Sequence, residues 1–171
     1  SHHVRPSSIV FVGPAGSGKS TLISHLGGAA LTAVSDSMGR LALDGHLNDE
    51  ILIGHNVSRG TLIPGFYYDR DKDVILWDCP GFGDPAGPEA DLVNAASISR
   101  VLGVSGCSRI VIVMSESKIG SRAGDITPIF DQVAQVFPDR AQRNNMVSLV
   151  ITGKSADLNP IKRLEALCDS S

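Results

Sequence analysis

The sequence has few cysteines, and their positions would not cross-link a small fold. Cys79, Cys107 and Cys168 are odd in number and widely spaced, and no C-x-x-C pair occurs. This pattern supports neither a disulfide framework nor a zinc cluster. We therefore expect a protein of a reducing compartment, with a cytoplasmic location.

Long hydrophobic runs are also missing. The longest unbroken runs, such as Ile110–Met114, have the length of a strand and are far too short to span a membrane. The start of the chain, Ser1-His2-His3, has no apolar stretch of the signal-peptide type. We expect residues 1–8 to be a tag remnant and lead-in, and we expect no membrane span in this chain.

An excess of positive charge is absent as well. Lys and Arg total 15, against 18 for Asp and Glu, which gives a formal net charge of −3. The basic footprint of a protein that binds nucleic acid or an anionic membrane is therefore missing. The length of 171 residues is that of one domain, which can bury a hydrophobic core without disulfide or metal cross-links.

What the sequence does contain is an alternation of short apolar runs with helical stretches. Strands are predicted at Ile9–Val12, Leu62–Tyr68, Val74–Trp77, Ile110–Met114 and Met146–Thr152, and helices at Lys19–Leu26, Pro88–Leu102, Ile126–Phe137 and Pro160–Cys168. Continuous apolar runs are typical of parallel strands that are buried on both faces. The pattern predicts an α/β three-layer domain with a mostly parallel sheet and helices on both faces.

One connection interrupts the alternation. Only residues 69–73 separate the predicted strands Leu62–Tyr68 and Val74–Trp77, which is too short for a crossover helix. These strands should form an antiparallel hairpin and place one antiparallel strand at the edge of the sheet. Residues 27–60 lack a clear period, apart from a weak apolar patch at Leu41–Leu43, and are predicted to form a long loop.

A phosphate-binding loop follows the first predicted strand. The pattern G-x-x-x-x-G-K-[ST] is matched by Gly13, Pro14, Ala15, Gly16, Ser17, Gly18, Lys19 and Ser20, with Thr21 next in the following helix. Glycines let successive N–H groups point at phosphate oxygens, and the helix N-terminus favours the negative charge. Lys19 is expected to contact the β- and γ-phosphates, and the Ser20 hydroxyl to bind Mg²⁺. The sequence therefore predicts a nucleotide-binding site.

A second motif ends the predicted strand Val74–Trp77. It reads Asp78-Cys79-Pro80-Gly81, and parallel strands present their ligands at such carboxyl ends. Asp78 is expected to hold Mg²⁺ through a water. Gly81 is expected to bring its backbone N–H to a γ-phosphate, because glycine allows a close approach.

These motifs resemble a known group of proteins. The stretch from Asp78 to Asp84, D-C-P-G-F-G-D, is similar to the D-x-P-G-F-G-D stretch of septins and AIG1-type GTPases. The segment Val57–Thr61 resembles their first switch, and residues 122–125 resemble a basic, then acidic, stretch before the third helix. The resemblance runs from about Ile9 to Leu158 and implies a P-loop GTPase domain.

The resemblance also implies roles for residues outside the two motifs. Thr61 would be the switch residue that reaches Mg²⁺ and γ-phosphate in the triphosphate state. Phe82 stands where Ras-like enzymes carry the glutamine that orients the attacking water, so hydrolysis is expected to be slow. Arg59 is a candidate arginine finger, acting in cis or across a homodimer at the nucleotide face.

Base recognition rests on the segment after the last predicted strand. Related GTPases carry [NT]-K-x-D there, and this chain offers Thr152, Lys154 and Asp157 in the same order with wider spacing. Either the loop bulges and Asp157 still reaches guanine, or specificity is relaxed. The resemblance favours GTP and GDP as ligands, with no effector indicated.

Two other functions remain open at this point. The phosphate loop also occurs in ATP-using P-loop kinases, although the basic residues show no clustered lid. A septin-like scaffold that holds nucleotide with little or no turnover is consistent with Phe82. Only one helix is predicted after Asp157, so residues 9–171 are expected to form a G domain that lacks its last strand.

Overall fold

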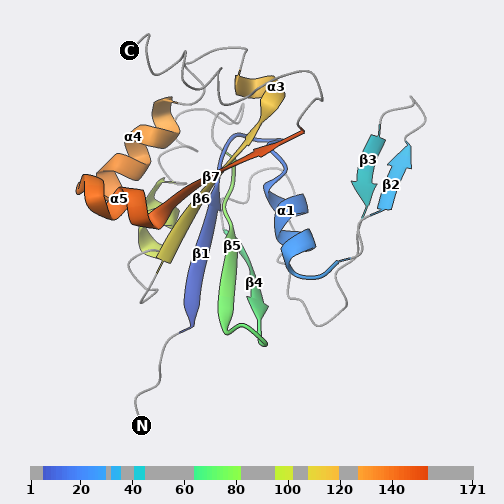
Figure 1. Ribbon diagram of the computed structural model, residues 1–171, viewed down its shortest axis with the longest axis horizontal. Coiled ribbons are helices and arrows are strands. Elements are labelled where there is room, and N and C mark those ends of the chain that lie inside the picture. Colours follow the sequence, from blue (N-terminus) through green and yellow to red (C-terminus); the bar gives the residue numbers. More distant parts are fainter. Residues whose placement is uncertain are drawn as a thin grey trace.

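The computed structural model describes residues 6–29, 32–35, 41–44, 64–81, 95–101, 108–119 and 127–153. Its main feature is a five-stranded sheet with the strand order β4-β5-β1-β6-β7 (Figure 1). The strands are β1 (Ser7–Val12), β4 (Gly65–Asp69), β5 (Val74–Asp78), β6 (Ser108–Ser115) and β7 (Val147–Thr152). All neighbouring strands are parallel except β4 and β5. The chain therefore has the mostly parallel α/β sheet with one antiparallel pair that the sequence predicts.

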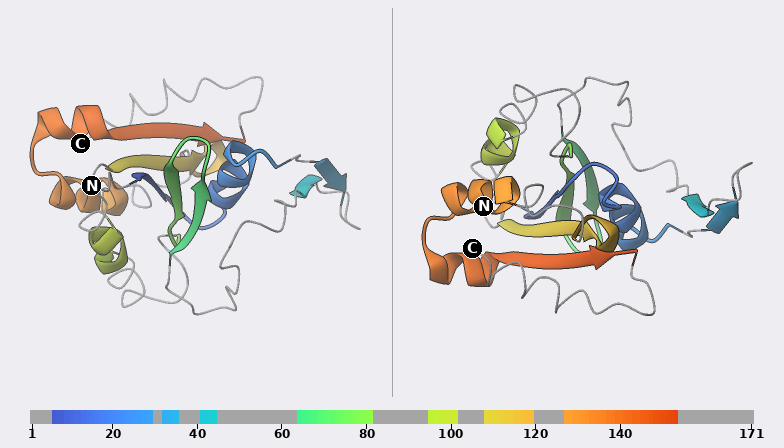
Figure 2. Two further views of the ribbon diagram at one scale, coloured as in Figure 1. Left: turned by 90° about the horizontal axis from the view of Figure 1, so that it is seen from below. Right: turned by 90° about the horizontal axis from the view of Figure 1, so that it is seen from above.

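Helices lie on both faces of this sheet. Helix α1 (Lys19–Leu26) occupies one side, and α4 (Thr127–Val136) and α5 (Arg140–Met146) lie on the other (Figures 1 and 2). On the α1 side, Ile23 packs against Phe11 and Val113. On the opposite side a larger cluster joins the central strands to α4 and to the helical segment 95–101, through the side chains of Val10, Ile98, Ile110, Ile112, Met114, Ile129 and Val133. Side chains of β1 alternate between the two clusters, as a central strand requires.

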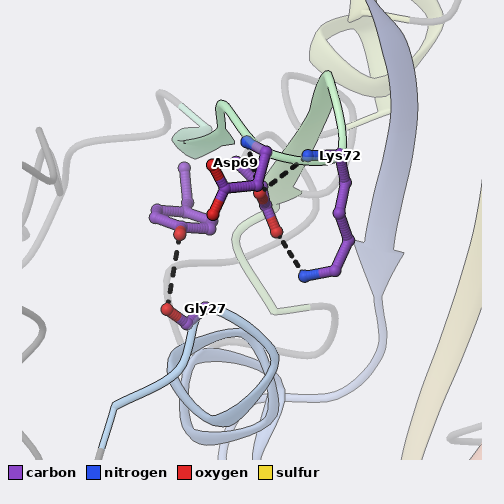
Figure 3. Close-up of polar contacts among 5 residues, drawn as sticks. Gly27, Asp69 and Lys72 are labelled. Carbon is purple, nitrogen blue, oxygen red and sulfur yellow. Dashed lines mark hydrogen bonds and ion pairs between the residues drawn. The ribbon is translucent and has the colours of Figure 1, made fainter.

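The hairpin of β4 and β5 confirms the predicted antiparallel edge. The pairing runs from Gly65 opposite Asp78 to Asp69 opposite Val74. In the turn, the Asp69 carboxylate accepts hydrogen bonds from the backbone of Asp71 and Lys72 and pairs with the Lys72 ammonium at 2.5 Å (Figure 3). The Tyr67 hydroxyl donates to the Gly27 carbonyl at 3.3 Å, which ties the edge strand to the end of α1.

Several boundaries differ from the sequence prediction. The strand expected from Leu62 begins at Gly65, since Pro64, which has no N–H to donate, lies outside it. The long loop expected over residues 27–60 is wrong in part, because β2 (Thr32–Ser35) and β3 (Leu41–Asp44) form a separate antiparallel pair. Each strand has four residues, too few to show a hydrophobic period, and the apolar patch at Leu41–Leu43 was the only feature of the sequence that indicated a strand there. The predicted helix Pro160–Cys168 lies outside the described residues.

Two short helices were not predicted. Helix α3 (Glu116–Ile119) directly follows β6, and α5 directly precedes β7. No residue of α5 is buried, so it has no apolar stripe from which it could have been recognised. Its last residue, Met146, packs partly against the larger core cluster, and local hydrogen bonds hold its first turn. Asp139 accepts from the N–H groups of Ala141 and Gln142 at 2.7 and 3.1 Å. The Arg143 guanidinium donates to the carbonyls of Phe137 and Pro138 at the end of α4.

None of the helices in the described part of the chain combines the length and the apolar character needed to cross a bilayer.

The Asp139 cap provides a test of this local account. Asp139→Ala removes the acceptor of two backbone N–H groups and is expected to lower the free energy of unfolding by about 1 kcal/mol. For a chain of this length the melting temperature should fall by about 2–4 °C, measured by circular dichroism. Asp139→Asn keeps an acceptor oxygen and serves as the control. Equal melting temperatures for the two variants would contradict the assigned cap.

Candidate nucleotide-binding site

The candidate site lies where the carboxyl ends of the parallel strands meet. The phosphate loop, residues 13–18, connects the end of β1 to the start of α1, and Asp78 and Thr152 are the last residues of β5 and β7. Parallel strands bring these ends to one edge of the sheet, so residues far apart in sequence become neighbours there. The sheet register alone thus places both predicted motifs together.

The phosphate loop packs tightly against β6. A Cβ built on Gly13 would lie 2.0 Å from the carbonyl oxygen of Val113, so no larger residue fits there. Helix α1 begins after Gly18, which has a φ of 86° and offers no side-chain cap, and the first turn of the helix has no acidic residue. The N–H groups of that turn therefore have no side-chain cap, an arrangement suited to binding an anion.

Lys19 is held under this loop. Its side chain is 7% exposed, and its ammonium donates to the carbonyls of Gly13 and Pro14, both at 3.0 Å. Burial lowers the pKa of Lys19 from its usual value, while the nearby Asp78 and Cys79 act in the opposite direction. A buried cation held by neutral carbonyls lacks a full counter-charge, and an anion bound at the loop would provide one.

Ser20 and Asp78 meet next to Lys19. The Ser20 hydroxyl donates to the Asp78 carboxylate at 2.5 Å, although the two residues are 58 positions apart in the sequence. Oxygen donors of this kind fit Mg²⁺, which takes few protein ligands and usually keeps several waters. Within the described ranges, no three His, Cys, Asp or Glu side chains gather closely enough to hold a metal on their own. A magnesium ion at Ser20 and Asp78 would thus be completed by phosphate and water.

The segment after Asp78 rests on the phosphate loop. The Cys79 N–H donates to the carbonyl of Phe11 at 3.2 Å, which fixes the direction in which the chain leaves β5. A Cβ built on Gly81 would lie 2.5 Å from the backbone nitrogen of Ala15 and 2.6 Å from its Cα. Gly81 is therefore required for this close approach of two backbones, and its predicted role toward a γ-phosphate stays a prediction.

Thr152 has structural contacts that its sequence motif did not suggest. Its hydroxyl is 2.6 Å from the carbonyl oxygen of Ser17 and 3.3 Å from that of Met114. Its side chain also faces Gly18, where a built Cβ would lie 3.5 Å from the Thr152 hydroxyl oxygen. Thr152 thus joins the end of β7 to the phosphate loop, a role that depends on strand order and carries no local sequence signal. Its predicted contact with a base remains a prediction.

Four predicted site residues lie outside the described residues. These are Arg59, Thr61, Lys154 and Asp157. The same holds for Phe82, which follows Gly81. The described part of the site therefore covers the phosphate loop, the start of α1 with Thr21, Asp78, Gly81 and Thr152.

Cys79 is buried beneath this site. It is 2% exposed, and burial, joined by the negative charge of Asp78, raises the pKa of its thiol to about 12. The thiol is thus protonated at neutral pH, and Cys79 fills space next to the core instead of acting as a nucleophile.

Comparison with known proteins places the chain in a family. The model of the 50S ribosome-binding GTPase family matches residues 8–154, so the chain belongs to this family of P-loop GTPases. Among solved structures it is similar to a mutant of NFeoB from S. thermophilus bound to GDP, with 12% sequence identity and a TM-score of 0.43. That match covers 95% of this chain and 60% of the other. A search of curated proteins finds no match.

The contact between Gly81 and Ala15 can be tested by adding one methyl group. Gly81→Ala is expected to lower the free energy of unfolding by about 1–3 kcal/mol, because the new Cβ overlaps backbone atoms. Gly65→Ala is the matched control at the other side of Asp78, where the built Cβ is 3.9 Å from its nearest neighbour. Its stability should change by less than about 0.5 kcal/mol in urea unfolding. Equal losses for the two variants would contradict the assigned contact.

The protonated state of Cys79 predicts low reactivity. With a pKa of about 12, the folded thiol at pH 8 is ionised in only about one molecule in ten thousand. Alkylation followed by peptide mass mapping should leave Cys79 unmodified in the native protein and modify it in urea. Because this pKa is raised on folding, the stabilising contribution of the thiol is complete below about pH 9 and declines as pH rises toward 12. Rapid native labelling of Cys79 would disprove the burial argument.

Proposed function

We propose that this chain binds GTP and GDP with Mg²⁺ and hydrolyses GTP slowly to GDP and phosphate, acting as a nucleotide-dependent switch. The observation that supports this most directly is the buried Lys19, held at 3.0 Å from two phosphate-loop carbonyls beside the paired Ser20 and Asp78. Membership of a GTPase family and the uncapped start of α1 support the same function.

In this proposal, different described residues bind the phosphates and the magnesium ion. The N–H groups of residues 13–18 and of the first turn of α1 receive the phosphates, and Lys19 supplies the positive charge for the β- and γ-phosphates. Ser20 binds Mg²⁺ directly, and Asp78 acts through a water. When bound, the ion would neutralise charge that develops on the phosphate oxygens during hydrolysis.

The finer parts of the proposal come from the sequence resemblance. Thr61 and Gly81 would respond to the γ-phosphate, and Thr152, Lys154 and Asp157 would receive guanine. Arg59 would support catalysis, in cis or across a homodimer at the nucleotide face. The closer likeness to septins and AIG1-type GTPases, and the cytoplasmic location, also stay predictions.

A second candidate is a nucleotide-binding scaffold without turnover. It is favoured by the identity of Phe82, since phenylalanine cannot orient a water molecule as glutamine does. A third reading, an ATP-using P-loop enzyme, makes the opposite prediction about the preferred base. Binding and turnover measurements together therefore separate the three candidates.

The test is displacement of a fluorescent GDP analogue from the purified chain. GDP is expected to displace it at a concentration at least about tenfold lower than ADP, a difference of about 1.4 kcal/mol. Lys19→Ala should weaken binding by about a hundredfold, because it removes the buried charge. Lys72→Ala is the matched control, since Lys72 lies at the opposite end of β5 in the hairpin turn.

The outcomes distinguish the candidates. Equal displacement by GDP and ADP would disprove guanine specificity. If phosphate is released from GTP no faster with the protein than in buffer alone, while GDP binding is intact, the scaffold is favoured over the enzyme. Unchanged binding in Lys19→Ala would contradict the assignment of the site itself.

A further inference from the structure

One side chain of the phosphate loop has a buried hydroxyl without a partner. Ser17 is 1% exposed, and within the described residues its hydroxyl makes no hydrogen bond. Burying a hydroxyl in this way is costly, and buried polar groups in native proteins are almost always paired. The hydroxyl therefore lowers the stability of the fold, and its presence in the loop needs an explanation.

The backbone of Ser17, in contrast, is fully engaged. Its N–H donates to the carbonyl of Pro14 at 3.2 Å, and its carbonyl accepts from the Thr152 hydroxyl at 2.6 Å. Both bonds use backbone atoms of Ser17, so an alanine at this position would make them equally well. The hydroxyl is thus not required to hold the loop in its shape.

The polar side chains next to Ser17 already have partners. The Lys19 ammonium is bonded to two carbonyls of the loop, and the Ser20 hydroxyl is bonded to the Asp78 carboxylate. These pairs are complete without the Ser17 hydroxyl. An acceptor for it would therefore have to arrive with a ligand.

The Ser17 side chain points across the loop. A Cβ built on Gly13, the first residue of the loop, would lie 3.1 Å from the Ser17 hydroxyl oxygen. The residues on either side, Gly16 and Gly18, have no side chains, and a Cβ built on Gly16 would meet nothing within 4 Å. The adjacent residues thus present no side chain that would obstruct a change of the Ser17 χ1 angle from one staggered position to another.

We propose that the Ser17 hydroxyl donates a hydrogen bond to an oxygen of a bound phosphate group. This rests on the proposed function, in which the loop receives the phosphates of a nucleotide through its backbone N–H groups, and it adds a side-chain contact. Ser17 directly precedes Gly18, after which α1 begins without a side-chain cap, an arrangement that favours an anion. Hydrogen bonds to a charged acceptor are stronger than those between neutral groups. A phosphate would therefore compensate for the burial of this hydroxyl.

Thermal unfolding of the full chain with and without GDP and Mg²⁺ tests the proposal. Without a ligand, Ser17→Ala should melt at the temperature of the wild type or up to about 4 °C higher, because it removes an unpaired buried hydroxyl. On addition of GDP, the variant should gain less in melting temperature than the wild type, since a more weakly bound ligand stabilises less. A hydroxyl with a purely structural role would instead lower the melting temperature of the ligand-free variant.

Calorimetric titration identifies the part of the ligand that Ser17 contacts. The dissociation constants of GDP and of inorganic diphosphate should both rise by about tenfold in Ser17→Ala, because the lost contact is to a phosphate oxygen. Ser24→Ala removes a hydroxyl from the same helix, α1, at a half-buried position away from the loop, and is the matched control. It should leave both dissociation constants unchanged.

Three results would overturn the proposal. They are unchanged affinities of Ser17→Ala for both ligands, a lower melting temperature of the ligand-free variant, and a weakened affinity for GDP with that for diphosphate unchanged. Failure of the proposed function looks different, because it is seen in the wild type. A wild type that binds diphosphate but not GDP would disprove guanine-nucleotide binding, and the diphosphate titration would still decide the role of Ser17. A wild type that binds neither ligand would disprove both.

Discussion

The packing of the phosphate loop against the ends of the central strands is the contact on which the candidate site depends. Gly13 lies against the backbone of Val113 so closely that a Cβ has no room, and Thr152 holds the carbonyl of Ser17 from the other side. These two contacts join the loop to β6 and β7. The loop is thus shaped by the sheet, and the position of Lys19 and the start of α1 follow from it.

Polar groups in this region are hydrogen-bonded in pairs. A bound ligand could take the place of one partner in each pair. The Lys19 ammonium is bonded to carbonyls, and the Ser20 hydroxyl to the Asp78 carboxylate. Such bonds satisfy groups that would otherwise be costly to bury. They also hold the side chains near the places where phosphate and a cation would need them, so little reorganisation is required when a ligand enters.

The sequence predicts the sheet well, and it places the proposed phosphate loop directly after the first strand, where the structure has the connection from β1 to α1. Strands such as β1 and β6 are continuous apolar runs because both faces are buried, and the loop from Gly13 to Ser20 has a fixed spacing because backbone N–H groups must converge. Helix α5 could not be predicted, since no residue of it is fully buried and the hydrogen bonds of Asp139 and Arg143 at its start form no apolar pattern. The hydrogen bonds that join Thr152 to the phosphate loop could not be predicted either, because they depend on which strands are neighbours in the sheet.

The chain contains one tryptophan, and its location has a practical consequence. Trp77 directly precedes Asp78, packs against the Phe66 ring at a tilt and donates from its indole nitrogen to the Ser8 hydroxyl at 3.4 Å. Indole emission depends on the polarity and hydrogen bonding around the ring. A displacement of Asp78 by a bound cation, or a movement of Phe66, would change the surroundings of the same fluorophore. The protein thus carries an intrinsic optical reporter positioned between the candidate site and the edge of the sheet.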